Sequence, residues 1–368
     1  MVETIKLLEV YIDDKRVGRL VLSPDRLSLF EYDAGWIMTG FSISPFYLPL
    51  KAGLFTARAE PFGGMFGVFE DSLPDGWGKL LVDRWLISKG IHPGTLSVLD
   101  RLSIVGEAGM GALVYRPAQY GRKDDGPKEL SYYADEVEKV LHNDYTGSIE
   151  ELCIKAGSSG GARPKVLIKI EGNEWLIKFK SSSDPANVGE IEYEYSALAK
   201  KCGIEMAETR LFEGKYFGVR RFDRESDKRI HMHSAAGLLY ASHRFPSLDY
   251  TELLKATLAL TRDITEVEKI FRQIVFNILI GNNDDHAKNF SFLCNNGHWQ
   301  VSPAYDLLPS DGFNGNHTTT VNGKGHPSLT DCLAVAKAVS FPIKTAGKII
   351  SEVESVIGGS VGQVIGNR

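Results

Sequence analysis

The chain lacks the features that mark membrane proteins, secreted proteins and proteins that coat nucleic acid. Its 368 residues include 4 cysteines and no Cys-x-x-Cys pair, so we expect neither a disulfide framework nor a structural zinc site. No apolar run approaches the ~20 residues of a transmembrane helix, and the N-terminus lacks the segments of a signal peptide. The formal net charge of −5 disfavours non-specific binding of nucleic acid. The composition predicts a soluble cytoplasmic protein of two or three domains, without membrane contact.

Several signatures of nucleotide-binding proteins are also missing. There is no Gly-x-x-x-x-Gly-Lys-Ser/Thr sequence, which argues against a P-loop. The absence of His-Arg-Asp, Asp-Phe-Gly and Ala-Pro-Glu excludes an ordinary eukaryotic-type protein kinase. Gly106–Gly111 is rich in glycine, but it leads into an expected strand and not into a helix, which argues against a dinucleotide-binding loop.

The most informative segment that is present begins at Gly281, after an apolar helical pattern over Ile270–Ile280. Asp284 is followed five positions later by Asn289, and Asp306 comes after alternating stretches that flank an Asn-Asn-Gly turn, which predicts a β-hairpin. Protein kinases use this spacing. Their first Asp accepts the substrate hydroxyl's proton, and the Asn and the second Asp hold Mg²⁺. A polar turn between a core helix and a hairpin would also account for these residue types.

Three upstream features favour the kinase interpretation. Gly157–Lys165 is rich in glycine and runs into an apolar strand, and small residues let backbone N–H groups approach phosphate oxygens. A flexible linker has the same composition. Lys178 stands among apolar residues of a second expected strand, where it can bind phosphates as the strand lysine of kinases does. The helix expected next carries Glu192 and Glu194, either of which could pair with that lysine.

Two clusters also suggest metal sites. Asp284–His286 could belong to a metallohydrolase, but that interpretation leaves the upstream elements unexplained. His231 and His233 alternate along an expected strand without an obvious third ligand, so we expect neutral surface histidines.

In the order and sequence of these elements, the chain resembles the HipA-type serine/threonine kinases of bacterial toxin–antitoxin systems. Two runs are specific to that family: Asp-x-His-Ala-Lys-Asn-Phe and Arg-Phe-Asp-Arg. The resemblance covers nearly the whole chain, including stretches at 71–78 and 105–113 that look like the family's N-terminal subdomain. The segments that carry it are Gly160–Lys165, Leu176–Lys178, Val219–Arg224, Gly281–Phe290 and Pro303–Asp306.

The resemblance implies a role for each matching position. Asp284 would be the catalytic base, and Asn289 and Asp306 would be the Mg²⁺ ligands. Lys178 would contact the phosphates of ATP, and backbone groups near residues 220–222 would form the adenine-binding hinge. The implied nucleotide-contacting or supporting residues are Ser158, Ser159, Gly160, Gly161, Lys178, Arg220, Arg221, Phe222, His286 and Lys288.

The resemblance also implies autophosphorylation in the Gly-rich loop. Alignment places the modified serine at Ser158, with Ser159 as the alternative. A phosphate there would add about −1.5 to −2 charges where the phosphates of ATP must bind, which would inhibit the kinase. Arg163 and Pro164 depart from the family's usual polar residues, and the proline stiffens the turn.

We therefore expect an α+β, protein-kinase-like bilobal fold. Its parts would be a β-rich N-terminal subdomain over 1–120, an N-lobe over 121–235 with the Gly-rich loop and phosphate-contacting lysine, and a mostly helical C-lobe over 236–368. The local patterns predict a hairpin over 7–22, a linker over 119–128 and a strand over 216–221. They predict helices over 77–89, 130–141, 149–154 and 190–203.

The function that the resemblance implies is Mg-ATP-dependent phosphorylation of a protein serine or threonine, with an aminoacyl-tRNA synthetase as a possible substrate. A HipB-like helix-turn-helix antitoxin would neutralise the kinase, and the protein would reach DNA only through that partner. One alternative is a small-molecule kinase of related fold, which shares the Asp-x-x-x-x-Asn arrangement. Another is a non-catalytic nucleotide-binding partner of a transcriptional repressor.

Overall fold

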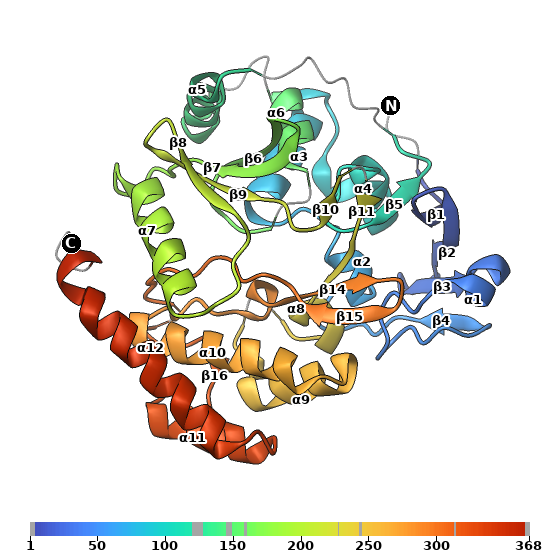
Figure 1. Cartoon of the computed structure of the whole chain (residues 1–368). Coiled ribbons are helices and arrows are strands. Elements are labelled where there is room, and N and C mark those ends of the chain that lie inside the picture. The colour runs from blue at the N-terminus through green and yellow to red at the C-terminus, as the bar shows by residue number, and fades with distance from the viewer. Residues whose placement is uncertain are drawn as a thin grey trace. The chain divides into compact units, whose positions relative to one another are not determined.

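The structure is a computed structural model that describes residues 4–119, 128–144, 149–157, 160–226, 228–242, 245–312 and 314–364. The fold is mixed, with 39% helix and 23% strand, which confirms the expected α+β class. The chain forms two compact units (Figure 1). The first consists of Met1–Gly189, Leu211–His233 and Asn295–Gly297, and the second of Glu190–Arg210, Ser234–Cys294 and His298–Arg368.

The first unit begins with an antiparallel sheet in the order β4-β3-β2-β1-β5. The hairpin expected over 7–22 is confirmed, with a turn at Asp13, which has a positive φ of 51°. Inward-facing apolar side chains such as Leu8, Val10 and Phe30 are fully buried. The five strands are β1 (Leu7–Ile12), β2 (Lys15–Leu22), β3 (Ser28–Tyr32), β4 (Leu54–Thr56) and β5 (Leu113–Arg116).

A second sheet of this part of the chain has the order β6-β7-β9-β8. Its strands are β6 (Lys165–Ile170), β7 (Asn173–Lys178), β8 (Thr209–Phe212) and β9 (Tyr216–Arg220). Helices α3 (Gly76–Ser88), α5 (Leu130–Leu141) and α6 (Ile149–Ala156) share an apolar core with it, which includes Trp77, Trp85 and Trp175. The three helices confirm the periodicity expected over 77–89, 130–141 and 149–154.

Apart from α7, which is described with the second unit, the other elements before residue 235 are short. They are α1 (Ala34–Thr39), α2 (Gly67–Glu70), η1 (Pro93–Thr95), α4 (Val98–Val105), β10 (Arg224–Glu225), β11 (Lys228–Arg229) and β12 (His231–Ser234). Most of the linker expected over 119–128 lies outside the described residues. The three-part domain division stays a prediction.

His231 and His233 are buried, so the expectation of surface histidines is wrong. Partners distant in sequence make their burial possible. His231 Nε2 lies 2.8 Å from the Ile43 carbonyl oxygen, and His233 lies 3.0 Å from Ser44 Oγ and 2.7 Å from Asp71 Oδ2. Burial lowers the pKa of His231 to about 4, which keeps this ring neutral as expected.

The second unit is mostly helical, as expected. Its helices are α7 (Val188–Lys201, which starts at the unit's border), α8 (Ala235–Leu239), α9 (Tyr250–Thr261), α10 (Ile264–Ile280), α11 (Leu329–Ala338) and α12 (Ile343–Val364). Its short strands are β13 (Leu248–Asp249), β14 (Ser291–Asn295), β15 (His298–Val301) and β16 (Thr319–Thr320), and η2 spans Ala287–Asn289. The two strands of the expected hairpin, β14 and β15, are neighbours in one sheet.

Helix α10 leads directly into the Asp-rich segment. It begins after Asp263, whose side chain accepts a hydrogen bond from the Thr265 N–H at 2.8 Å. Its apolar stripe, with Ile270, Phe271 and Ile274, is fully buried in the core of the second unit. It ends at Gly281, whose left-handed φ of 69° suits glycine at this position. None of the helices in the described ranges is long and apolar enough to cross a membrane.

Candidate active site

The segment after α10 is fixed at its start by asparagine side chains. The Asn282 N–H donates to the Asn277 carbonyl at 2.8 Å, and Asn282 Nδ2 donates to Asn277 Oδ1 at 3.0 Å. Asn282 Nδ2 also lies 3.4 Å from the carbonyl oxygen of Asp306. The amide of Asn282 therefore links the end of α10 to the backbone at Asp306, across 24 positions of sequence.

The two adjacent aspartates of this segment have opposite environments. Asp284 is exposed. Asp285 is fully buried, and its carboxylate accepts hydrogen bonds at 2.7–3.1 Å. The donors are the Tyr250 hydroxyl, the His317 ring and the backbone N–H groups of Thr318 and Thr319. Asp285 thus anchors the loop inside the second unit, whereas Asp284, the predicted catalytic base, is exposed.

Asn289 is buried and oriented by its own loop. Its Nδ2 donates to the backbone carbonyl of Asp284 at 2.8 Å, and its N–H donates to the His286 carbonyl at 2.8 Å. Because the amide nitrogen is committed to Asp284, the atom that can serve as a metal ligand is Oδ1. The five-residue spacing therefore joins Asp284 and Asn289 in one hydrogen-bonded turn.

The hairpin brings the segment before Asp306 back to this turn. The Tyr305 hydroxyl donates to the Lys288 carbonyl at 2.6 Å and lies 2.6 Å from Ser291 Oγ. Asp306 itself has a positive φ of 55°, a left-handed conformation that aspartate tolerates better than most residues. Asp284, Asn289 and Asp306 accordingly lie on neighbouring loops of the second unit.

His286 and Lys288, predicted to support the loop, lie between Asp284 and Asn289 in the sequence and are both half-buried. The Nδ1 atom of His286 is buried and makes no hydrogen bond within the described residues. The backbone of Lys288 holds the Tyr305 hydroxyl, so Lys288 has a supporting contact through its main chain.

The predicted phosphate-binding elements lie in the first unit. Lys165 and Lys178 are direct partners in the antiparallel pairing of β6 with β7, so both side chains leave the sheet on the same face. Lys178 Nζ is 5.6 Å from the centre of the Phe217 ring. Ser158 and Ser159 lie outside the described residues, whereas Gly160 and Gly161 are exposed.

The predicted adenine hinge has side chains in very different positions. Arg220 is exposed and Phe222 is half-buried, but Arg221 is buried in ion pairs with Asp223 at 2.7 Å and Glu174 at 3.0 Å. Burial alone would raise the pKa of Asp223, but the charges of Arg221 and Arg224 outweigh it and lower this pKa to about 2.

The Arg221 N–H donates to the Glu174 carbonyl at 2.9 Å, so this backbone group forms a hydrogen bond to strand β7. The buried ion pairs of its side chain, with Asp223 and Glu174, give Arg221 a structural role in the first unit. The hinge role stays a prediction for the backbone over Arg220–Phe222.

The alternative of a metallohydrolase gains no support. Within the ranges that the structure describes, no group of three or more His, Cys, Asp or Glu side chains could hold a metal ion. Asp285, one of its required ligands, is already surrounded by hydrogen-bond donors. An amide oxygen of Asn289 and the Asp306 carboxylate are hard oxygen ligands of the kind that Mg²⁺ prefers.

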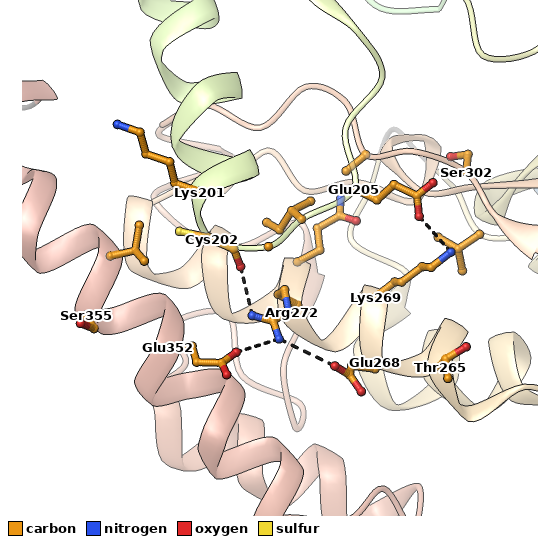
Figure 2. A pocket seen from close by; sticks show the side chains of 16 residues that line it. Lys201, Cys202, Glu205, Thr265, Glu268, Lys269, Arg272, Ser302, Glu352 and Ser355 are labelled. Carbon is orange, nitrogen blue, oxygen red and sulfur yellow. Dashed lines mark hydrogen bonds and ion pairs between the residues drawn. The ribbon is translucent and has the colours of Figure 1, made fainter.

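A pocket of about 760 Å³ in the second unit is lined by other residues (Figure 2). Arg272 binds the Cys202 carbonyl at 3.0 Å and Glu352 at 2.9 Å, and Lys269 pairs with Glu205 at 3.0 Å. None of the predicted site residues lines this pocket. Because these cations are paired with carboxylates, the pocket gives no reason to expect nucleotide phosphates there.

Two protein-family models match the chain. The HipA N-terminal domain matches residues 8–116, and the HipA-like C-terminal domain matches residues 157–359, a region that contains every predicted site residue. The chain belongs to the HipA family. Both halves of the chain therefore match the family that the sequence motifs indicate.

Several relatives of this HipA-family chain are named as kinases. Y4mE of Sinorhizobium fredii, provisionally named a kinase, is 30% identical over 352 residues, which cover 84% of this chain and 79% of the relative. Y4dM of the same organism, named in the same way, is 26% identical and covers 86% of this chain and 81% of the relative. The serine/threonine-protein kinase toxin HipA of Shewanella oneidensis is 23% identical and covers 83% of this chain and 76% of the toxin.

A solved structure supports the fold. The complex of S. oneidensis HipA, HipB and operator DNA contains a chain that matches this one with a TM-score of 0.72 at 19% identity, covering 97% of this chain and 90% of that chain. The likeness shows that this HipA-family chain has the kinase-like fold expected from its sequence.

Sequence reasoning missed the residue that anchors the Asp-rich loop after α10. Asp285 was considered only as a possible metal ligand, because its donors come from Tyr250 and residues 317–319, far away in sequence. A single sequence carries one weak signal for this role: an aspartate next to another aspartate, at the point where the apolar stripe of α10 ends.

Proposed function

We propose that the protein is a Mg-ATP-dependent protein serine/threonine kinase of the HipA toxin type. The observation that carries the proposal is the arrangement of three residues on neighbouring loops of the second unit. Asp284 is exposed, the Asn289 side chain is bound to the backbone of Asp284, and Asn282 links this segment to the backbone of Asp306. Kinases that place an Asp, an Asn and a second Asp in this order use them as proton acceptor and metal ligands.

Each of these residues has a separate role in the proposed phosphoryl transfer. Asp284 accepts the proton of the attacking hydroxyl, which its exposed position permits. Lys178 and the backbone around Gly160 and Gly161 bind the phosphates of ATP. Asn289 Oδ1 and the Asp306 carboxylate are the residues that would hold Mg²⁺, which supplies positive charge to the phosphates when bound. Most of the acceleration then comes from positioning and electrostatics.

The same proposal includes the substrate and partner. The protein phosphorylates a protein substrate, for which an aminoacyl-tRNA synthetase is the candidate, and itself at Ser158 of the Gly-rich loop. A HipB-like antitoxin neutralises it and links it to DNA. The S. oneidensis relative, which was solved with HipB and operator DNA, supports the assignment of such a partner.

The test is transfer of the γ-phosphate from labelled ATP to the protein and to candidate synthetases in the presence of Mg²⁺. Wild-type protein should transfer phosphate, and the Asp306→Asn variant should lose at least ~100-fold of this activity because a ligand of the phosphate-bound metal is removed. Circular dichroism should show both proteins folded. Substantial transfer by the folded Asp306→Asn variant would refute the assignment of the metal site.

A further inference from the structure

Asp75 occupies the capping position of α3 but does not cap this helix. Aspartate at a helix N-cap normally accepts a hydrogen bond from an N–H of the first turn. Here the side chain makes no such bond, and Asp75 Oδ1 instead accepts the N–H of Gly161 at 2.6 Å. The two residues are 86 positions apart and belong to the same unit. The carboxylate has therefore been diverted from its own helix to the Gly-rich loop.

Gly161 supplies the missing cap in return. The N–H of Trp77, in the first turn of α3, donates to the Gly161 carbonyl at 3.0 Å. The segments at Gly76 and Gly161 approach so closely that a Cβ on Gly76 would lie 2.4 Å from the Gly161 carbonyl oxygen. Gly76 also has a positive φ of 44°. Both polar groups of Gly161 are thus bound by one short segment, residues 75–77.

The peptide between Gly160 and Gly161 is held from both sides. Its carbonyl oxygen, on Gly160, accepts a hydrogen bond from the ammonium of the buried Lys165, and its N–H, on Gly161, points to the Asp75 carboxylate. A positive charge at the oxygen and a negative charge at the N–H match the peptide dipole. Rotation of this peptide would bring its oxygen towards the carboxylate, so the two charges fix its orientation.

The first residue of the loop, Gly157, also lies against the N-terminal part of the chain. A Cβ on Gly157, which has a positive φ of 56°, would lie 2.6 Å from the Ala108 carbonyl oxygen. Ala108 and Asp75 both belong to the region matched by the HipA N-terminal domain, whereas Gly157 and Gly161 belong to the HipA-like C-terminal domain. The N-terminal region therefore approaches the Gly-rich loop at two positions, Gly157 and Gly161.

We propose that Asp75 is a positioning residue for the phosphates of ATP, acting through the Gly160–Gly161 peptide. The inference rests on the proposed kinase function and adds to it a residue from outside the matched C-terminal domain. Phosphate binding by a glycine-rich loop depends on the directions of its N–H groups. A loop whose Gly160–Gly161 peptide is free to rotate must be ordered at the expense of binding energy. Removing the Asp75 carboxylate should consequently weaken binding of the phosphates and leave binding of the adenine and ribose unchanged.

The experiment compares two ligands that differ in phosphates. Isothermal titration of the full-length chain gives the Kd of the non-hydrolysable analogue Mg-AMP-PNP and the Kd of adenosine. Asp75→Ala should raise the Kd of AMP-PNP by ~10-fold and leave that of adenosine within ~2-fold, as expected for one lost charge-assisted hydrogen bond. Asp75→Asn keeps an oxygen acceptor and should recover part of the affinity. The KM for ATP should rise while kcat at saturating ATP changes little.

Two further variants make the assignment specific. Gly76→Ala keeps the carboxylate but places a methyl group against Gly161, so it should also weaken AMP-PNP selectively. Asp83→Asn is the matched control, because Asp83 lies on the same helix and pairs with Lys79 and Arg101. It should leave both Kd values unchanged.

The outcomes separate this inference from the proposed function. Wild-type protein that does not bind Mg-AMP-PNP would overturn the kinase assignment and the role of Asp75 with it. Wild-type binding together with an unchanged AMP-PNP Kd in Asp75→Ala would overturn the role of Asp75 alone. Tighter binding by Asp75→Ala would also contradict it, since the carboxylate would then compete with the phosphates. Parallel losses for AMP-PNP and adenosine would show a general structural role in place of positioning.

Discussion

Replacing the buried Asp285 with alanine should destabilise the protein far more than any change at its exposed neighbour Asp284. The substitution leaves four donors without their acceptor in a fully buried site. An unsatisfied buried donor costs about 1–3 kcal/mol, and relaxation reduces the sum, so we expect a loss of at least ~3 kcal/mol. For a unit of roughly 150 residues this lowers the melting temperature by about 6–12 °C.

Differential scanning calorimetry without nucleotide measures this difference directly. Asp284→Asn is the matched control, and because its side chain is exposed, its melting temperature should stay within ~2 °C of wild type while phosphoryl transfer is lost. Asp285→Asn retains one oxygen acceptor and should fall between the two. A melting temperature of Asp285→Ala close to wild type, or an equal loss in Asp284→Asn, would refute the division of roles between the two aspartates.

Three further predictions concern the first unit and the Gly-rich loop. Lys178→Met should weaken Mg-AMP-PNP binding by ~10-fold or more in titration calorimetry without lowering the melting temperature, and unchanged affinity would remove this lysine from the phosphate site. The pKa of Asp223 is depressed to about 2, so its contribution of about 2 kcal/mol is present above pH ~4 and lost as pH falls towards 2. Urea unfolding at pH 7 and pH 3 should therefore show a smaller pH dependence in Asp223→Asn than in wild type, and equal dependence would contradict the ion-pair account. Ser158→Ala should abolish autophosphorylation detected by peptide mass mapping while AMP-PNP still binds; a phosphate that persists would move the site to Ser159.

The sequence predicted the elements whose signals are local. Apolar periodicity and turn residues predict the helix before the Asp-rich loop, the hairpin after it and the strand that contains Lys178. Each of these elements is present. The left-handed Gly281 at the end of α10 was not predicted, although a glycine after an apolar helical stripe is a local signal of the same kind.

What the sequence did not predict depends on contacts between distant segments. Asp285 is distinguished from Asp284 only by donors that tertiary folding brings together. The burial of His231 likewise requires the Ile43 carbonyl, 188 positions away. Asp75 resembles an ordinary helix cap until its partner Gly161 is known. In each case the residue type allowed two environments, and packing selected one.

The measurement that tests the kinase assignment most directly is intact mass and phosphopeptide mapping of the purified chain after incubation with Mg-ATP, beside Asp284→Asn. Our account predicts one added phosphate in the Gly-rich peptide of the wild-type chain, on Ser158, and none in the variant. An equal amount of phosphate on both proteins, or its absence from wild type together with no transfer to any protein substrate, would contradict the account.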